Sequence, residues 1–234
     1  MIMLLRSIAI VLLSVMVVAG CSDDVVIPEP NLVLESGMVN AKLSAVRKPG
    51  DVVMKGGTVS ALTVTRVRVL VDRVLLHAND DSSSTDDKLV KSGPFIFVAD
   101  STGGRVIASV NVTPGSYRKL KFEFHPFDSS IAPDYAMDPT FKDFVTNDRY
   151  SVIIEGNLVR NGQPARFTYK SDVNQNLSLD FMPELVIGSN GASTVVLKFD
   201  AASVFRSGQD ILDPDDKQNE SEIDNGIKQS LRMN

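Results

Sequence analysis

The sequence predicts an all-β protein, an antiparallel β-sandwich of the immunoglobulin or transthyretin-like kind, with a short C-terminal helix. Three observations indicate this fold. Apolar and polar residues alternate along many short stretches, turn-forming residues separate these stretches, and clear helical spacing is confined to the end of the chain. About nine or ten predicted strands follow one another, which is typical of a sandwich.

The first segment has the pattern of a lipoprotein signal peptide. Arg6 is the only charge before Asp23, and the apolar run at residues 8–20 is shorter than the roughly 20 residues that span a bilayer. The run ends in an aliphatic residue, two small residues and Cys21, which resembles the lipobox of bacterial lipoproteins. We expect a signal peptide at residues 1–20 and a diacylglyceryl group on Cys21, joined by a further acyl chain such as palmitate. The alternative is a structural cysteine after an ordinary signal.

Composition limits the function classes. One of the 24 basic residues lies in the signal and none of the 29 acidic ones does, so the mature chain has a formal charge of −6. The negative net charge gives no electrostatic attraction to the phosphates of nucleic acid. Cys21 is the only cysteine, which excludes intrachain disulfides and cysteine-ligated metals.

The mature chain divides into a tether and one domain. Residues 21–31 are rich in proline and acidic residues, which keep a segment extended and solvated. Residues 32–234 are expected to form a single β-sandwich domain.

Four predicted strands each place apolar residues on one face and polar residues on the other. Their apolar positions are Val106, Ala108, Val110 and Val112; Leu120, Phe122 and Phe124; Leu177, Leu179 and Phe181; and Val195, Leu197 and Phe199.

A longer β run covers residues 63–77. Its apolar positions change phase by one residue at Asp72-Arg73, which predicts a β-bulge or bend. Arg66 and Arg68 lie on the polar side of the first half. The apolar residues before and after the change are Val67, Val69 and Val71, then Val74 and Leu76.

Turn sequences separate the strands. Asn161-Gly162 predicts a two-residue β-hairpin, and residues 100–104, 113–116 and 188–191 predict further turns. The acidic, serine-rich residues 78–88 predict a solvated loop.

Two stretches favour helix. Proline after Asp138 predicts one helical turn within residues 138–144. Near the C-terminus, Asn219 and Glu222 have capping-box spacing. The apolar stripe that follows, Ile223, Ile227 and Leu231, predicts a helix that lies across an open end of the sandwich.

Two stretches resemble an uncharacterised family of bacterial lipid-anchored lipoproteins, a domain of unknown function. The first contains Gly93-Pro94-Phe95 and then Pro114-Gly115-Ser116-Tyr117, a Pro-Gly-x-Tyr turn before an alternating strand. The second contains Lys198-Phe199-Asp200 and, later, Asn225-Gly226-Ile227. The resemblance covers roughly residues 60–230 and implies an all-β domain of the cell envelope. It implies no catalytic residues.

Catalytic signatures are absent from the sequence. No serine lies in a G-x-S-x-G motif, and no nucleotide-binding glycine pattern occurs. His77 could form a metal site with Asp80 and Asp81, but a histidine at a strand end before a solvated loop is the simpler interpretation. We therefore expect no enzyme.

Two acidic segments could hold calcium. Asp172, Asn174, Asn176 and Asp180 copy the first spacings of a calcium loop, but Leu177 and Pro183 stand where such a loop has glycine and glutamate. The second segment is the candidate metal site, and the alternative is that its carboxylates favour the start of the following helix. Its residues are Asp210, Asp213, Asp215, Asp216 and Asn219.

A carbohydrate platform is limited by scarce aromatic residues, since the chain has no Trp and four Tyr. Tyr135 is the best candidate for an exposed ring, in the long connection at residues 126–144. Such connections often carry function, and the alternative is a loop that closes one end of the sandwich.

The sequence therefore predicts a non-enzymatic, lipid-anchored binding, adhesion or structural module of the bacterial envelope, at the outer membrane. The alternative is a lipoprotein that binds a small ligand or a glycan. Within this alternative, bound calcium could stabilise the domain. The membrane is the expected partner through the anchor. The sequence does not identify a protein or glycan partner.

Overall fold

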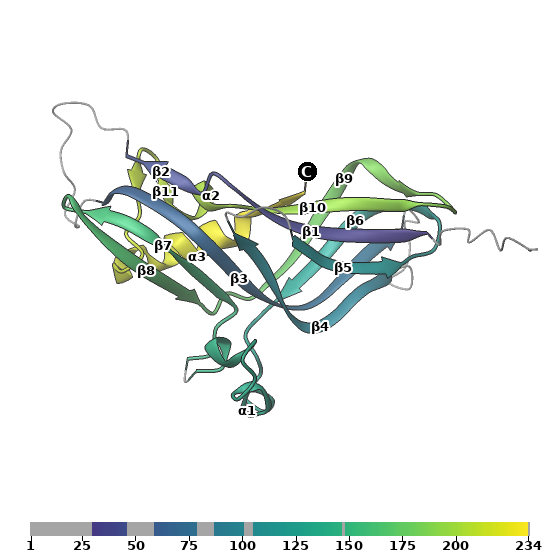
Figure 1. Ribbon diagram of the computed structural model, residues 1–234, viewed down its shortest axis with the longest axis horizontal. Helices are drawn as coiled ribbons and strands as arrows, with labels where there is room; N and C mark the ends of the chain where they lie inside the picture. The colour runs from purple at the N-terminus through teal and green to yellow at the C-terminus, as the bar shows by residue number, and fades with distance from the viewer. Residues whose placement is uncertain (1–29, 46–58, 79–86, 101–104, 147, 234) are drawn as a thin grey trace, which may run out of the picture.

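The computed structural model describes residues 30–45, 59–78, 87–100, 105–146 and 148–233. The predicted signal peptide, Cys21 and most of the tether lie outside the described residues, as do the centres of the predicted loops at 78–88 and 100–104. The described chain is mostly strand, which confirms the all-β sandwich (Figure 1). No helix in this part is long and apolar enough to span a bilayer.

The strands are β1 (Asn31–Val39), β2 (Lys42–Ser44), β3 (Val59–Ala78), β4 (Asp87–Asp100), β5 (Arg105–Asn111), β6 (Gly115–Phe124), β7 (Val152–Arg160), β8 (Gln163–Ser171), β9 (Gln175–Ile187), β10 (Ala192–Asp200), β11 (Arg206–Ser207), β12 (Asp210–Ile211) and β13 (Leu231–Met233). The α-helices are α1 (Ala132–Tyr135), α2 (Ala201–Phe205) and α3 (Glu220–Gln229), and the 3-10 helices are η2 (Lys142–Phe144) and η3 (Lys217–Asn219).

Strand β3 is the spine of the larger sheet, whose order is β8-β7-β3-β6-β9. Because β3 has 20 residues, two strands pair along each of its edges: β7 and β6 on one, β2 and β4 on the other. Its pairing with both β4 and β6 shifts register between Val71 and Arg73. This confirms the predicted bulge, and β3 bends there so that the sheet forms two halves.

The smaller sheet has the order β13-β10-β1-β5. One pair, β1 with β10, is parallel, so the sandwich is not antiparallel throughout. The prediction that Val106 faces the core is wrong. The β1–β5 register shifts between Leu34 and Glu35, and Val106 lies beyond that shift, where it is exposed.

The core is covered differently in the two halves of the larger sheet. In one half the smaller sheet packs on it, and Phe97, Phe122, Leu34 and Phe199 are fully buried there. In the other half α2 and α3 cover β7 and β8 (Figure 1). The ring of Phe205 on α2 packs edge-on against the ring of Phe167 on β8, with ring centroids 5.6 Å apart.

Helix α3 is part of the core, as the apolar stripe predicts. Ile223, Ile227 and Leu231 are buried, but Leu231 belongs to β13 and pairs with Phe199 of β10. At the end of the helix, the Ser230 hydroxyl and amide both donate to the carbonyl of Ile227. Instead of lying across an open end of the sandwich, the helix lies beside α2 and against β8, where its Asp224 accepts hydrogen bonds from the larger sheet.

The predicted cap of α3 is wrong. The Asn219 side chain makes no cap hydrogen bond and instead donates to the carbonyl of Asp213. The physical reason is that η3 runs directly into α3, so the helical segment starts earlier. Asp216 caps this start by accepting from the amide of Gln218.

The predicted hairpin turn is confirmed. Asn161 and Gly162 join β7 to β8 with positive φ angles of 52° and 78°, the geometry that a tight two-residue hairpin requires.

Candidate binding site

The connection between β6 and β7, residues 125–151, projects from the sandwich and carries α1 and η2 (Figure 1). The predicted helical turn within residues 138–144 is present as η2. Before it, the Asp138 side chain accepts a hydrogen bond from the amide of Thr140, and the Asp138 carbonyl accepts from the amides of Phe141 and Lys142. Helix α1 was not predicted. We call residues 125–151 the β6–β7 connection.

Three aromatic rings organise the β6–β7 connection. Tyr135 stacks on Phe127 with ring centroids 4.5 Å apart and an interplanar angle of 20°. Phe141 meets both rings edge-on, at 5.6 and 5.2 Å. Tyr135 is therefore half-buried in this stack, so the suggestion that it is an exposed ring is wrong. The stack gives the connection a small core of its own.

Phe144 fastens the connection to the sheet. Its side chain is fully buried among Leu70 of β3, Ile153 of β7 and Phe127, in a cluster separate from the main core. Leu70 and Ile153 face away from the sandwich interior, so the connection covers the outer surface of the larger sheet instead of closing its end.

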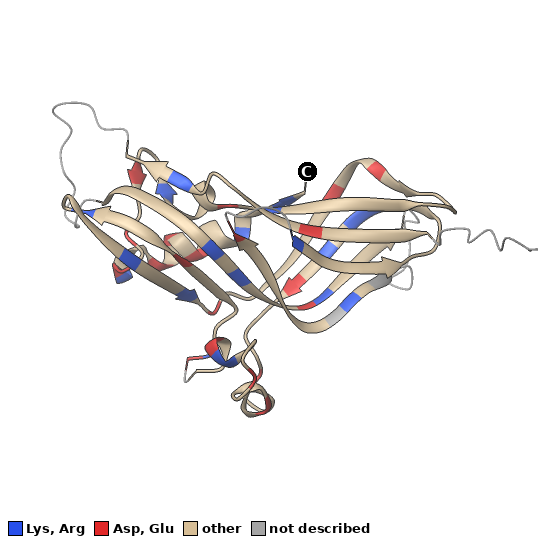
Figure 2. Cartoon of the chain, viewed as in Figure 1, with Lys and Arg blue, Asp and Glu red and all other residues tan. Residues whose placement is uncertain are grey.

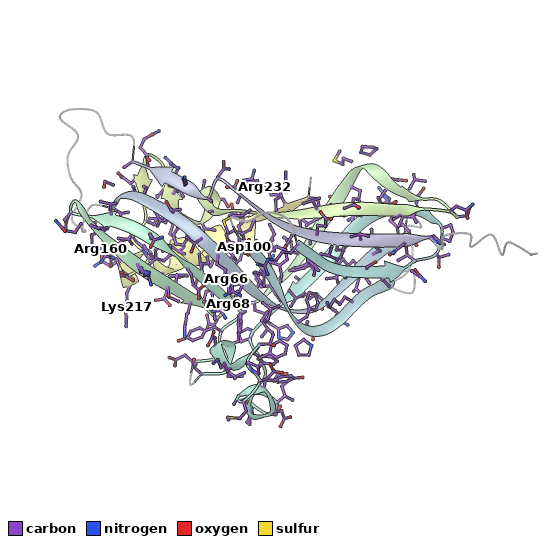
Figure 3. The ribbon with its side chains drawn as sticks, viewed as in Figure 1. Arg66, Arg68, Asp100, Arg160, Lys217 and Arg232 are labelled. Atoms are coloured by element: carbon purple, nitrogen blue, oxygen red, sulfur yellow. The ribbon has the colours of Figure 1, made fainter. Side chains whose placement is uncertain are left out.

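Arg68 lies where the connection meets the sheet (Figure 3). Its guanidinium bonds Asp143 of η2 at 2.7 Å and Glu155 of β7 at 3.0 Å, and lies 5.6 Å from the centroid of the Phe144 ring. The hydrogen bond from Arg68 holds the pKa of the Asp143 carboxyl below its usual value. The side chain of Arg68 is only 12% exposed, although the sequence places it on the polar face.

A polar pocket of about 410 Å³ opens at the base of the connection. Its two walls are the legs of the connection, held together by Arg149, which donates to the carbonyl of Phe127 at 2.6 Å. Asp172 and Asn174, which directly follow β8, complete the lining of the pocket. The lining residues are His125, Pro126, Phe127, Asp128, Asp148, Arg149, Asp172 and Asn174.

The pocket is acidic in balance. Asp128, Asp148 and Asp172 line it together with one arginine, Arg149. Beside the pocket, burial and the nearby Asp148 carboxylate raise the pKa of the Tyr150 hydroxyl. The ring Nδ1 of His125 lies 3.0 Å from the carbonyl of Pro126. If it donates there, Nε2 is the acceptor of the neutral ring.

The fold brings together residues that the sequence singles out separately. His125, Asp172 and Asn174 line one pocket. Asp180, the later ligand of the predicted calcium loop, lies away from them on β9 and pairs with Lys119 at 3.6 Å. Sequence reasoning missed Asp128, Asp148 and Arg149. The signal that could have found them is their position at the two ends of one long connection.

Four of the five candidate metal residues have side-chain bonds to protein partners. Arg160 bonds Asp213 through two nitrogens, at 2.6 and 2.5 Å, and reaches Asp215 at 2.5 Å. Asp216 caps η3, and the side chain of Asn219 bonds the Asp213 backbone. Asp210 lies in β12, paired with Ser207. Among the described residues, no group of three or more His, Cys, Asp or Glu side chains could hold a metal ion.

His77 ends the long strand, where β6 and β4 still flank it. Its suggested metal partners Asp80 and Asp81 lie outside the described residues.

The pocket offers carboxylate, amide and imidazole acceptors with a guanidinium donor, in a setting open to solvent. This set suits hydrogen bonding to a polar ligand. A scan against models of protein families found no match, and searches of curated proteins and of solved structures found none either.

Proposed function

We propose that the chain is a non-enzymatic binding module of the bacterial envelope, held at the outer membrane by lipids on Cys21. The signal-peptide pattern, the small residues before Cys21 and the acidic tether support the anchor. One structural observation carries the binding role. The β6–β7 connection is an ordered projection with a core of its own, on a rigid sheet, and Ile131 and Met137 are exposed on it.

The anchor is tested by replacing Cys21 with serine. We expect the C21S chain to leave the detergent-soluble membrane fraction and to lose labelling by radioactive palmitate, because no other cysteine can carry the lipid. Substitution of Ser22 by alanine is the matched control and should leave labelling intact. Continued labelling of the C21S chain would contradict the proposal.

The polar pocket favours a second candidate, binding of a small polar ligand such as a sugar. Its balance of three carboxylates against one guanidinium suits a ligand that carries an amine as well as hydroxyl groups. An amino sugar has both.

This candidate is tested by nuclear magnetic resonance titration with matched pairs of neutral and amino sugars. We expect the amino sugar to shift the amide signals of His125 and Asn174, and Asp148→Asn to weaken its binding about tenfold, the loss of one charge-assisted hydrogen bond. Asp180→Asn, a carboxylate outside the pocket, is the control. Equal responses to both sugars, or no response, would reject the amino-sugar ligand.

A further inference from the structure

The tip of the β6–β7 connection combines exposed apolar side chains with negative charge. Met137 is 91% exposed and Ile131 is 43% exposed, on either side of α1. Residues 129–141 contain Asp134 and Asp138 and no lysine or arginine. Figure 2 shows acidic residues around α1, and the nearest basic residue along the chain after them is Lys142 in η2.

The tip is ordered by aromatic packing and by a hydrogen bond. The stack of Phe127, Tyr135 and Phe141 lies directly behind α1, and Asp138 fixes the turn after Met137. A preformed projection loses little conformational entropy when a partner covers it. Met137 and Ile131 are therefore exposed on a preformed surface.

We propose that this tip is a protein-docking surface, and that its partner presents an apolar hollow bordered by lysine or arginine side chains. The inference rests on the proposed function. A convex tip requires a concave partner, and the flexible thioether of Met137 adapts to an irregular hollow. The carboxylates of Asp134 in α1 and Asp138 beside Met137 require a rim of opposite charge.

The same charge argues against two other occupants. An anionic lipid surface repels an acidic tip. A second copy that met this one tip to tip would bring the acidic side chains together. In addition, α1 lies well away from the start of β1, where the chain arrives from the anchor (Figure 1).

The test is site-specific photo-crosslinking in the cells that make the protein, with benzoylphenylalanine at position 137. The matched control has the same probe at position 182, because Met182 on β9 is also 91% exposed. We expect one discrete protein adduct from position 137 and none from position 182. Mass spectrometry of the crosslinked peptide should place the contact in an apolar hollow with lysine or arginine at its edge.

Charge is tested in the same experiment with Asp134→Lys, which should lower the adduct yield at least fivefold. Glu222→Lys is the control, since Glu222 is likewise an exposed acidic residue in the first turn of a helix. Adducts only with lipid, only with a second copy of the chain, or with a contact surface that lacks basic residues would overturn the inference, and so would the absence of any adduct.

Membrane fractionation of the same cells separates the two proposals. If the chain is anchored through Cys21 and no adduct forms, the docking inference fails while the anchored module stands. If the chain is not anchored, the proposed envelope module fails whatever the crosslinking shows.

Discussion

Ile227→Asp is expected to weaken the whole domain by several kcal/mol. Ile227 is buried between α3, α2 and the larger sheet, and burial of such a side chain contributes about 1.5–3 kcal/mol. An aspartate at this position also loses its hydration without gaining a partner. Against a typical total of about 5–15 kcal/mol, this loss is large. Chemical denaturation followed by circular dichroism measures it.

The control for this variant is Asn225→Asp, which adds the same carboxylate to the exposed face of α3. Its midpoint should stay close to that of the unsubstituted chain. Truncation after Asp210 should have a still larger effect, because it removes buried Ile211 and Leu212 together with α3 and β13. A truncated chain that keeps its melting temperature would show that the C-terminal segment is a dispensable tail.

Period-two alternation predicted most strands because each apolar face has one neighbour, the core. It failed at Val106 because β5 contains an extra residue in its pairing with β1. Leu34 pairs with Ala108 and the next residue, Glu35, pairs with Val106, so Ile107 is bulged and the inward phase of β5 ends before Val106. The sequence of β5 alone contains no sign of that shift.

Arg68 shows the limit of the same pattern on the outer face. The alternation with Val67 and Val69 places it correctly on the polar side of β3. It is nevertheless mostly buried, because η2, about 75 residues later, covers it with Asp143 and Phe144. Local periodicity carries no information about a distant segment that packs on a polar face.

The candidate site was only partly predictable for a related reason. His125 and Asp172 could each be recognised as chemically capable, but the pocket exists because β6, β7 and β8 bring the ends of two connections together. In the acidic segment at residues 210–219, nothing local indicates that Arg160 from the β7–β8 hairpin bonds Asp213 and Asp215.

Phe144→Ala is expected to release the β6–β7 connection from the sheet while the sandwich remains folded. Phe144 is fully buried in the small cluster with Leu70 and Ile153, separate from the main core. Truncation of a buried phenylalanine to alanine typically costs about 3–5 kcal/mol. The small cluster has few other members. We therefore expect the substitution to reduce mainly the free energy that holds the connection on the sheet, and to reduce the free energy of global unfolding less.

Limited trypsin digestion gives the measurement, because Lys142 lies in η2 next to Phe144 and Arg149 lies in the returning leg. Cleavage after Lys142 should become at least tenfold faster in the variant, and circular dichroism should keep its β signal. Met137→Ala is the control, since that side chain is exposed at the tip and supports no packing. If Phe144→Ala instead lowers global stability by the full amount without faster cleavage, the connection and the sandwich unfold as one unit. The tip of the connection would then be as rigid as the core, and its apolar surface could be modified only at exposed positions such as Met137.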